Sequence, residues 1–229
     1  KLISGITHLG GHAVAFPVIE IADIVDDAGL ESIMVHIAEY DLAIFVSANA
    51  VEKAMERLVN LPVRCTAVGR ATFAALKAHG AADVILPEHR FDSEGLLELP
   101  ELKSVQGKKI AIFRGEGGRE LLGNELKARG ARVEYAECYR RVVPDAGFPY
   151  GEAEIQALTA TSGESVGNLC EMLKDCQWIR KKPIFVTHER IGTIARNAGF
   201  RQVIVTEAGD EGLIEGLVKW FEVGESAHG

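Results

Sequence analysis

The hydrophobic and polar positions of the chain follow one recurring scheme. A short apolar run leads into a polar corner, and apolar residues then recur at the spacing of a helix, as in YDLAIFVSANAVEKAM at residues 40–55. The scheme returns at residues 63–80, 111–126, 153–173 and 182–199. Strands that alternate with helices over short links predict an α/β fold with parallel sheets.

The predicted strands are apolar on both faces. AIFV, AIF and PIFV show no polar alternation, which is typical of strands covered by helices on both sides. The predicted helices end at Gly80, Gly130 and Gly199, and a new strand follows each of them. These glycines fit the left-handed position just after a helix C-terminus, where a Cβ atom is penalised.

The corner sequences fall into two pairs. SANAVEK resembles SGESVGN, and VGRATFAALKAHG resembles THERIGTIARNAG. Two β-prone stretches, AFPVIEI (15–21) and ECYRRVVP (137–144), lie where the helical scheme lapses. We therefore predict two similar, flavodoxin-like α/β lobes with parallel sheets, joined by a two-stranded antiparallel β linker. One lobe comprises 1–16 and 145–229, and the other comprises 17–144 with the linker strands near 17–21 and 138–144.

The polar corners should lie at one edge of each sheet. Right-handed crossovers place every strand-to-helix corner at the carboxyl ends of the strands, where ligands bind in open α/β folds. This reasoning predicts the following ligand-facing residues: Ser47, Asn49, Gly69, Arg70, Thr72, Arg114, Gly115, Ser162, Ser165 and Arg190.

A glycine-rich turn, RGEGGR at 114–119, precedes one of the predicted helices. Glycine-rich turns at a helix N-terminus are typical of anion sites. No Gly-Lys-Ser/Thr follows the glycines, so the turn is not a Walker A loop, and Glu120 stands where a dinucleotide fingerprint needs its third glycine.

Composition narrows the functional classes. The 229 residues suffice for one large or two small domains, and the net charge of -8 argues against a general nucleic-acid binder. No stretch has the apolar length of a membrane span or the pattern of a signal peptide, so we expect a cytoplasmic protein without membrane contact. The four cysteines have no CxxC spacing and no His pair beside them, so we expect reduced thiols and no metal site.

Seven stretches, in this order, resemble the uroporphyrinogen-III synthase family. They are FPVIEI, YDLAIFVSANAV, AVGRATFAALKAHG, SEGLLELPEL, KKIAIFRGEGGRELLGNELKARGARVEYAECYRRVVP, TSGES and VTHERI. They extend from about residue 15 to residue 200, and the segment from Ile110 to Pro144 is the most specific.

The resemblance implies a cofactor-free cyclising lyase of haem biosynthesis. Such an enzyme closes hydroxymethylbilane, a linear tetrapyrrole, into uroporphyrinogen III with loss of water and inversion of ring D. The resemblance also implies two lobes that face each other across a ligand cleft. We expect a monomer, and whether hydroxymethylbilane synthase hands the substrate over in a transient contact stays open.

The resemblance makes Tyr139, in ECYRR, the candidate catalytic residue. A phenol is protonated at neutral pH, so it can donate to the departing hydroxyl group. The alternative is a tyrosine that only packs at the linker. Arg141 lies two residues along the strand, on the same face. With it, the substrate-binding candidates become Ser47, Asn49, Gly69, Arg70, Thr72, Arg114, Gly115, Arg141, Ser162, Ser165 and Arg190.

The same residues also fit structural roles that involve no ligand. The serines and threonine fit as N-caps of the helices that follow, and the arginines as solvent-exposed cations. His188 fits as a corner residue without a role in proton transfer. The alternative function is a two-lobed binding protein for a small acidic ligand, without catalysis. A nucleotide or phosphosugar enzyme would need metal-binding carboxylates or a P-loop lysine near 115–118, and the sequence has neither there.

Overall fold

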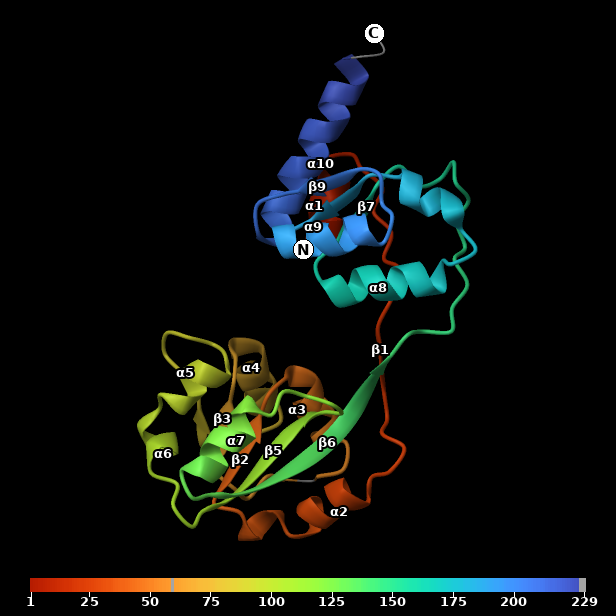
Figure 1. Cartoon of the computed structure of the whole chain (residues 1–229). Coiled ribbons are helices and arrows are strands. Elements are labelled where there is room, and N and C mark those ends of the chain that lie inside the picture. Colours follow the sequence, from red (N-terminus) through yellow and green to blue (C-terminus); the bar gives the residue numbers. More distant parts are fainter. Residues whose placement is uncertain (59, 227–229) are drawn as a thin grey trace. The chain divides into compact units, whose positions relative to one another are not determined.

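The structure is a computed structural model, and it describes residues 1–58 and 60–226 (Figure 1). The chain divides into two compact units. Unit 1 comprises Lys1–Glu20 and Val143–Gly229, and unit 2 comprises Ile21–Val142. That these units work as two lobes joined by a β linker stays a prediction.

Unit 2 is built on a six-stranded sheet with the order β1-β6-β5-β2-β3-β4. The pairs from β6 to β4 are all parallel, and β1 lies beside β6 at one edge. The strands are β1 (Glu20–Ala22), β2 (Leu42–Phe45), β3 (Cys65–Ala67), β4 (Val84–Ile85), β5 (Lys109–Gly115) and β6 (Arg132–Val142). The predicted α/β class with parallel sheets is thereby confirmed.

The strand order differs from the flavodoxin-like order that we predicted. Numbered along the chain from β2 to β6, the parallel strands lie in the order 3-2-1-4-5, whereas a flavodoxin has the order 2-1-3-4-5. Numbered from β5 and continued with β2, the same neighbours read 2-1-3-4-5, so the sheet has the flavodoxin arrangement with a permuted chain order, which hydrophobic periodicity does not predict. The order reverses between β2 and β5, so their carboxyl ends flank the switch point where open α/β sheets bind ligands.

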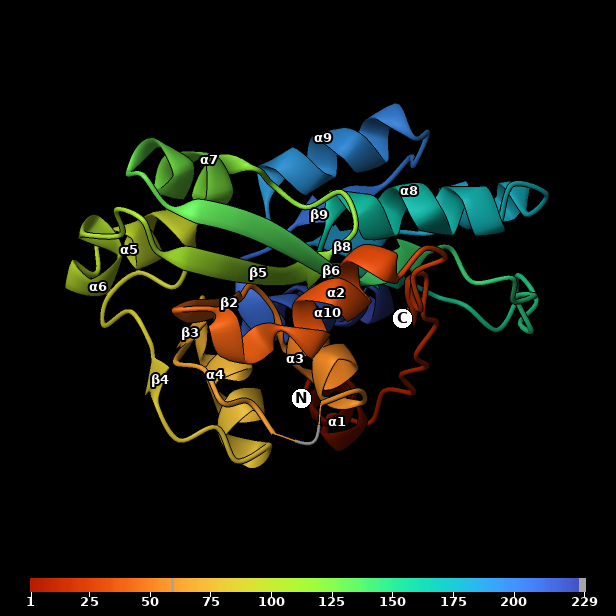
Figure 2. The same cartoon turned by 90° about the horizontal axis from the view of Figure 1, so that it is seen from below.

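Helices cover both faces of this sheet (Figure 2). Phe45 and Phe113 stack with ring centroids 4.4 Å apart in a core beneath α2, α3 and α4. Ile44 and Ile112 point to the other face, which α5, α6 and α7 cover. The helical elements are α2 (Ala28–Val35), η1 (Ile37–Glu39), α3 (Ala48–Met55), α4 (Arg70–Ala78), α5 (Ser93–Leu97), α6 (Pro100–Lys103) and α7 (Leu121–Ala128).

Unit 1 holds a smaller parallel sheet with the order β7-β8-β9. Its core packs Val166, Ile184 and Ile191 together, and Phe185 meets the ring of Trp220 edge-on at 6.0 Å. The elements are β7 (Leu158–Ala160), β8 (Ile184–Val186), β9 (Val203–Val205), α1 (Leu2–His8), α8 (Gly163–Met172), η2 (Gln177–Lys181), α9 (Glu189–Asn197) and α10 (Gly209–Ser226).

The predicted glycine stops are confirmed. Gly80, Gly130 and Gly199 follow α4, α7 and α9 with φ angles of 82°, 85° and 92°. Only glycine adopts this left-handed conformation without a steric penalty, so each helix ends where the next connection to a strand begins.

Candidate functional site

The carboxyl edge of the larger sheet brings three predicted residues together. Ser47 follows β2, Gly115 ends β5, and Tyr139 lies opposite Gly115 on β6. Ser162, Ser165 and Arg190 belong to unit 1 and are described with it below. In unit 2, Ser47, Gly115 and Tyr139 therefore lie together beside the switch point of the sheet.

The hydroxyl groups of Ser47 and Tyr139 are hydrogen-bonded to each other, with their oxygens 3.0 Å apart. Ser47 is also the N-cap of α3, where its Oγ accepts a hydrogen bond from the amide of Ala50 at 3.1 Å. The Oγ atom of Ser47 can therefore accept a hydrogen bond from the Tyr139 hydroxyl and still donate its own hydroxyl hydrogen outward. Tyr139 itself is only 3% exposed, so Ser47 is the more accessible member of the pair.

A β-bulge decides which way Tyr139 points. Arg114 pairs with Glu137, but the next residue, Gly115, pairs with Tyr139, so Cys138 is an extra residue on β6. Consecutive residues of β5 point to opposite faces of the sheet, and their partners on β6 do the same. Tyr139 consequently joins the core cluster of Phe45 and Phe113, although strict alternation from Glu137 would place it on the opposite face.

Gly115 lets the ring of Tyr139 approach the backbone of β5. A Cβ atom at this position would lie 2.7 Å from Cε2 and 3.1 Å from the hydroxyl oxygen of Tyr139. Real Cβ atoms essentially never come as close as 2.7 Å, so any larger residue would displace the ring. The structure thus gives this predicted binding residue a steric function.

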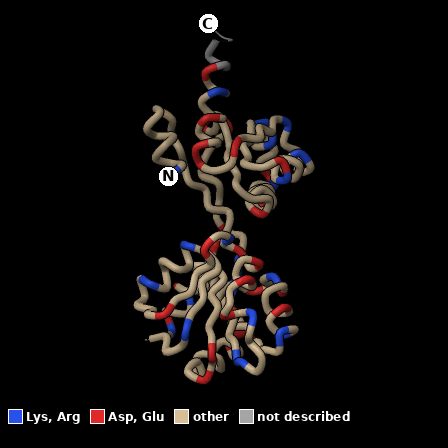
Figure 3. The backbone as a smooth tube through the Cα atoms, turned by 90° about the vertical axis from the view of Figure 1, so that its left-hand side faces the viewer, with Lys and Arg blue, Asp and Glu red and all other residues tan. Residues whose placement is uncertain are grey.

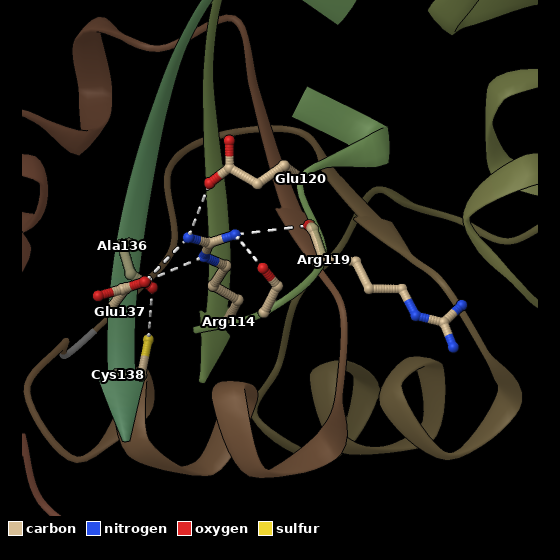
Figure 4. Close-up of polar contacts among 7 residues, drawn as sticks. Arg114, Arg119, Glu120, Ala136, Glu137 and Cys138 are labelled. Carbon is tan, nitrogen blue, oxygen red and sulfur yellow. Dashed lines mark hydrogen bonds and ion pairs between the residues drawn. The ribbon is translucent and has the colours of Figure 1, made fainter. Parts of the chain in front are cut away.

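Arg114 is a buried cation, 7% exposed, whose donors are used within the chain (Figure 4). Its Nη2 and Nε lie 2.9 and 3.2 Å from Oε1 of Glu137, and Nη2 lies 3.6 Å from the carboxylate of Glu120. Nη1 donates to the carbonyl oxygens of Gly118 at 2.9 Å and Arg119 at 3.4 Å. These contacts favour a structural role for Arg114 over the predicted direct contact with a ligand.

The guanidinium of Arg114 also stacks on Tyr135, with Cζ 3.8 Å from the ring centroid. The Tyr135 hydroxyl is buried without a hydrogen-bond partner among the described residues. Burial, and after it the carboxylate of Glu120, raise the pKa of Tyr135, so its proton stays in place at neutral pH. Tyr135 therefore acts as an apolar platform for the cation.

The corner after β3 contains Gly69, Arg70 and Thr72. Gly69 is the N-cap of α4 and has no side chain to cap the helix, so the first amides of α4 stay free of a side-chain acceptor. Thr72 is 4% exposed, and its hydroxyl has no hydrogen-bond partner among the residues that the structure describes. Arg70 is exposed, with its guanidinium 4.7 Å above the ring of Phe91. These residues are compatible with carboxylate binding, which stays a prediction.

The remaining candidates of unit 2 lie at the surface. Asn49 is exposed in the first turn of α3, and Arg141 is exposed near the end of β6. The neighbouring Arg140 donates from Nε to the backbone oxygen of Asp23 at 3.1 Å.

The unit 1 corners use their polar side chains as helix caps. Ser162 caps α8 by accepting from the amide of Ser165 at 3.0 Å, and the two hydroxyl oxygens lie 2.8 Å apart. His188 caps α9, with Nδ1 accepting from the amide of Arg190 at 3.1 Å. This use of His188 agrees with the expectation of a corner residue. The side chain of Arg190 is exposed.

The described residues also bear on thiol reactivity, metal binding, membrane spans and the distribution of charge. Burial raises the pKa of Cys65 and of Cys138 to about 12, so neither is a nucleophile at neutral pH. Among the described residues no group of three His, Cys, Asp or Glu side chains is placed to hold a metal ion. No helix in the described part of the chain has the length and hydrophobicity needed to cross a bilayer. Acidic and basic residues are interspersed along the backbone of each unit (Figure 3).

Sequence reasoning missed Glu137 and the bulge at Cys138. Glu137 adjoins the candidate tyrosine in ECYRR, so its position was a usable signal. Nothing in the local sequence marks Cys138 as an extra residue, because a bulge depends on the register with the neighbouring strand.

The fold and these corners define a class: an α/β protein with parallel sheets that presents hydroxyl groups, helix N-termini and arginines at the carboxyl ends of its strands. The model of the family described as uroporphyrinogen-III synthase HemD matches residues 1–215. The uroporphyrinogen-III synthase of Salmonella typhimurium is 34% identical over 223 residues, which cover 91% of each chain. That of Escherichia coli is 32% identical over 226 residues, covering 92% of this chain and 91% of the relative. The chain belongs to the uroporphyrinogen-III synthase family.

Solved structures support the same fold. The uroporphyrinogen-III synthetase of Helicobacter pylori superposes with a TM-score of 0.64 at 15% identity, covering 91% of this chain and 95% of that one. A mutant uroporphyrinogen III synthase of Thermus thermophilus gives a TM-score of 0.57 at 20% identity, covering 98% and 94%. At these identities the likeness bears on the fold alone.

Proposed function

We propose that this chain is a uroporphyrinogen-III synthase, a cyclising lyase that converts hydroxymethylbilane into uroporphyrinogen III and water. Family membership supports the reaction class. The observation that carries the residue assignment is the hydrogen bond between Ser47 and Tyr139 beside the switch point of the larger sheet.

Substrate binding is proposed to rest on many modest contacts. Hydroxymethylbilane has an acetate and a propionate on each ring, so it is a flexible polyanion. A carboxylate at a helix N-terminus gains only about 0.3–1 kcal/mol when exposed, and more when partly buried. The uncapped N-terminus of α4 with Thr72 and Arg70 suits one carboxylate. Asn49, Arg141, Ser162, Ser165 and Arg190 are the further candidates, so that both units contribute.

The proposed chemistry begins with departure of the substrate's hydroxyl group. The C–O bond breaks, the pyrrole nitrogen supplies the electron pair, and a proton converts the leaving hydroxide into water. Ser47 and Tyr139 are proposed to deliver that proton, since Tyr139 can donate to Ser47 while Ser47 donates to the leaving oxygen. The substituted α-carbon of ring D then bonds to the freed methylene carbon and forms a spiro intermediate. The older bond from that α-carbon to its other methylene group breaks, this methylene group bonds to the free α-carbon of ring D, and the proton lost there replaces the one that was donated.

The energetic demand on the site is small. Hydroxymethylbilane closes without an enzyme, but to the type I isomer, in which ring D is not inverted. A hundredfold preference for type III requires a difference in barrier of about 2.7 kcal/mol. Holding the two ends of the substrate in one geometry can provide this without a strong acid.

The organisation of the molecule fits this proposal. Units 1 and 2 are taken as the two predicted lobes, and β1 beside β6 as their linker. A monomeric state and a transient contact with hydroxymethylbilane synthase stay predictions that accompany the proposal.

Replacing Tyr139 by Phe tests the residue assignment. The variant keeps the ring but removes the hydroxyl group, so formation of the type III isomer should slow by about 10²-fold, the lower range for general acid catalysis. Binding of the substrate or product, followed by fluorescence titration, should change by less than about threefold, because no carboxylate contact is lost. A variant with wild-type turnover would remove Tyr139 from the mechanism and leave the family activity standing.

A further inference from the structure

Arg114 and Glu137 form a partly buried ion pair that the proposed chemistry does not use. Their closest contact is 2.9 Å, and the side chain of Arg114 is 8% exposed while that of Glu137 is 35% exposed. Such a pair contributes little net stability, because the loss of hydration of the buried Arg114 offsets much of the attraction between the two charges. The position of this ion pair next to Tyr139 therefore indicates a role other than stabilising the fold.

The pair lies at the register shift between β5 and β6. Arg114 is the last residue of β5 before the shift, and Glu137 is its partner on β6. One residue further along, Gly115 faces Tyr139 on the opposite side of the sheet. The ion pair thus joins the two strands at the point where the bulge turns Tyr139 toward Ser47.

The same guanidinium holds the glycine-rich turn. It donates to the carbonyl oxygens of Gly118 and Arg119, and so draws the segment 116–119 back against the end of β5 (Figure 4). Gly118 packs on the arginine, since a Cβ atom there would lie 3.2 Å from Cδ of Arg114. One buried side chain therefore fixes both the strand register and the turn that leads into α7.

We propose that Arg114 and Glu137 are positioning residues, which hold the bulge so that the hydroxyl group of Tyr139 points at Ser47. The inference rests on the proposed role of Tyr139. In this role Arg114 supports the position of Tyr139 and does not bind the substrate. A displacement of the Tyr139 ring by about 1 Å would lower the rate by up to 10²-fold.

Glu137→Gln is the first test, because glutamine keeps the shape of glutamate and removes its charge. The rate of type III formation at saturating substrate should fall by about tenfold to hundredfold, while KM stays within about threefold. Type III is the proper readout, since type I also forms without the enzyme. A wild-type rate in a folded Glu137→Gln variant would overturn the proposal.

The chain offers a matched control in Arg129, which follows α7 and precedes β6 at the opposite ends of the strands. It contacts Glu125 at 3.0 Å and donates to the carbonyl oxygens of Leu97 and Leu102 at 2.8 and 2.9 Å. Glu125→Gln should lower the melting temperature about as much as Glu137→Gln and leave the rate unchanged. An equal loss of rate in both variants would indicate a general loss of structure and contradict a positioning role.

A double-mutant cycle with Tyr139→Phe separates this inference from the proposed function. If Glu137 acts through Tyr139, the Glu137→Gln change should cost less than about threefold in the Tyr139→Phe background. Additive effects would overturn the inference while the synthase activity stands, and a wild-type protein that forms no type III would instead remove the proposed function. If Glu137→Gln does not fold, Arg114→Lys decides by the same criteria, because a single amine cannot reach both Glu137 and the turn.

Discussion

At the scale of single residues, Tyr139 shows how a few contacts turn an ordinary side chain into a candidate for catalysis. Its hydroxyl group is held by Ser47, and its ring is held against the bare backbone of Gly115. The sequence alone suggested Tyr139 and Ser47 as separate candidates. Their hydrogen bond depends on the spatial neighbourhood of β2 and β6, which residue types do not reveal.

Gly115→Ala tests the steric part of this arrangement. The added Cβ atom would meet the tyrosine ring at 2.7 Å, so either the ring or the end of β5 must shift. We expect a loss of about 1–3 kcal/mol in the free energy of unfolding, typical of overpacking, and a clear fall in the rate of type III formation.

Urea unfolding and the isomer assay measure these two effects. Gly29→Ala, in α2, is the control, since nothing lies within 4 Å of a Cβ atom there and Gly29 is not a candidate binding residue. A Gly115→Ala variant with wild-type stability and rate would show that the close contact with Tyr139 has no consequence.

At the scale of elements, the sequence predicted much of the secondary structure and little of its connectivity. The apolar runs and glycine stops located β2, α3, β3 and α4, because each depends on local periodicity and on local backbone conformation. The strand order 3-2-1-4-5 and the bulge at Cys138 depend on pairing between distant segments. Local patterns hold no information on that pairing, which is why the order of the strands along the chain was not predicted.

The strands β3 and β6 each bury a thiol, Cys65 and Cys138, which makes the larger unit sensitive to alkaline pH. Burial raises the pKa of both thiols to about 12 from an ordinary value of 9.0. A group whose pKa is raised by folding contributes its full stability below pH 9 and loses that contribution as the pH rises toward 12. At pH 10.5 the loss should be on the order of 2 kcal/mol for each thiol.

Urea unfolding at pH 7.5 and 10.5 measures this loss. The Cys65→Ala/Cys138→Ala variant should be less stable than the wild type at pH 7.5 because of its cavities, yet its stability should fall less between the two pH values. An equal fall in both proteins would show that the thiols do not titrate in this range.

At the scale of the whole molecule, the chain has two α/β units whose corners share one chemistry. Hydroxyl groups and helix N-termini occur in both, at Ser47 and Gly69 in unit 2 and at Ser162 and His188 in unit 1. The family resemblance could be read from the ordered stretches of sequence, and the family model confirms it over residues 1–215. The contacts of Arg114 could not be predicted from sequence, because an arginine at a corner looks the same whether it binds a ligand or holds a turn.

The central claim is that the folded protein directs ring closure to the inverted isomer. The most direct measurement supplies hydroxymethylbilane from a deaminase in situ, adds this protein, oxidises the products and separates uroporphyrin I from uroporphyrin III by chromatography. We expect predominantly type III, with a fraction that rises with the concentration of this protein. Type I alone, from protein shown by circular dichroism to be folded, would show that this protein does not direct ring closure to the inverted isomer.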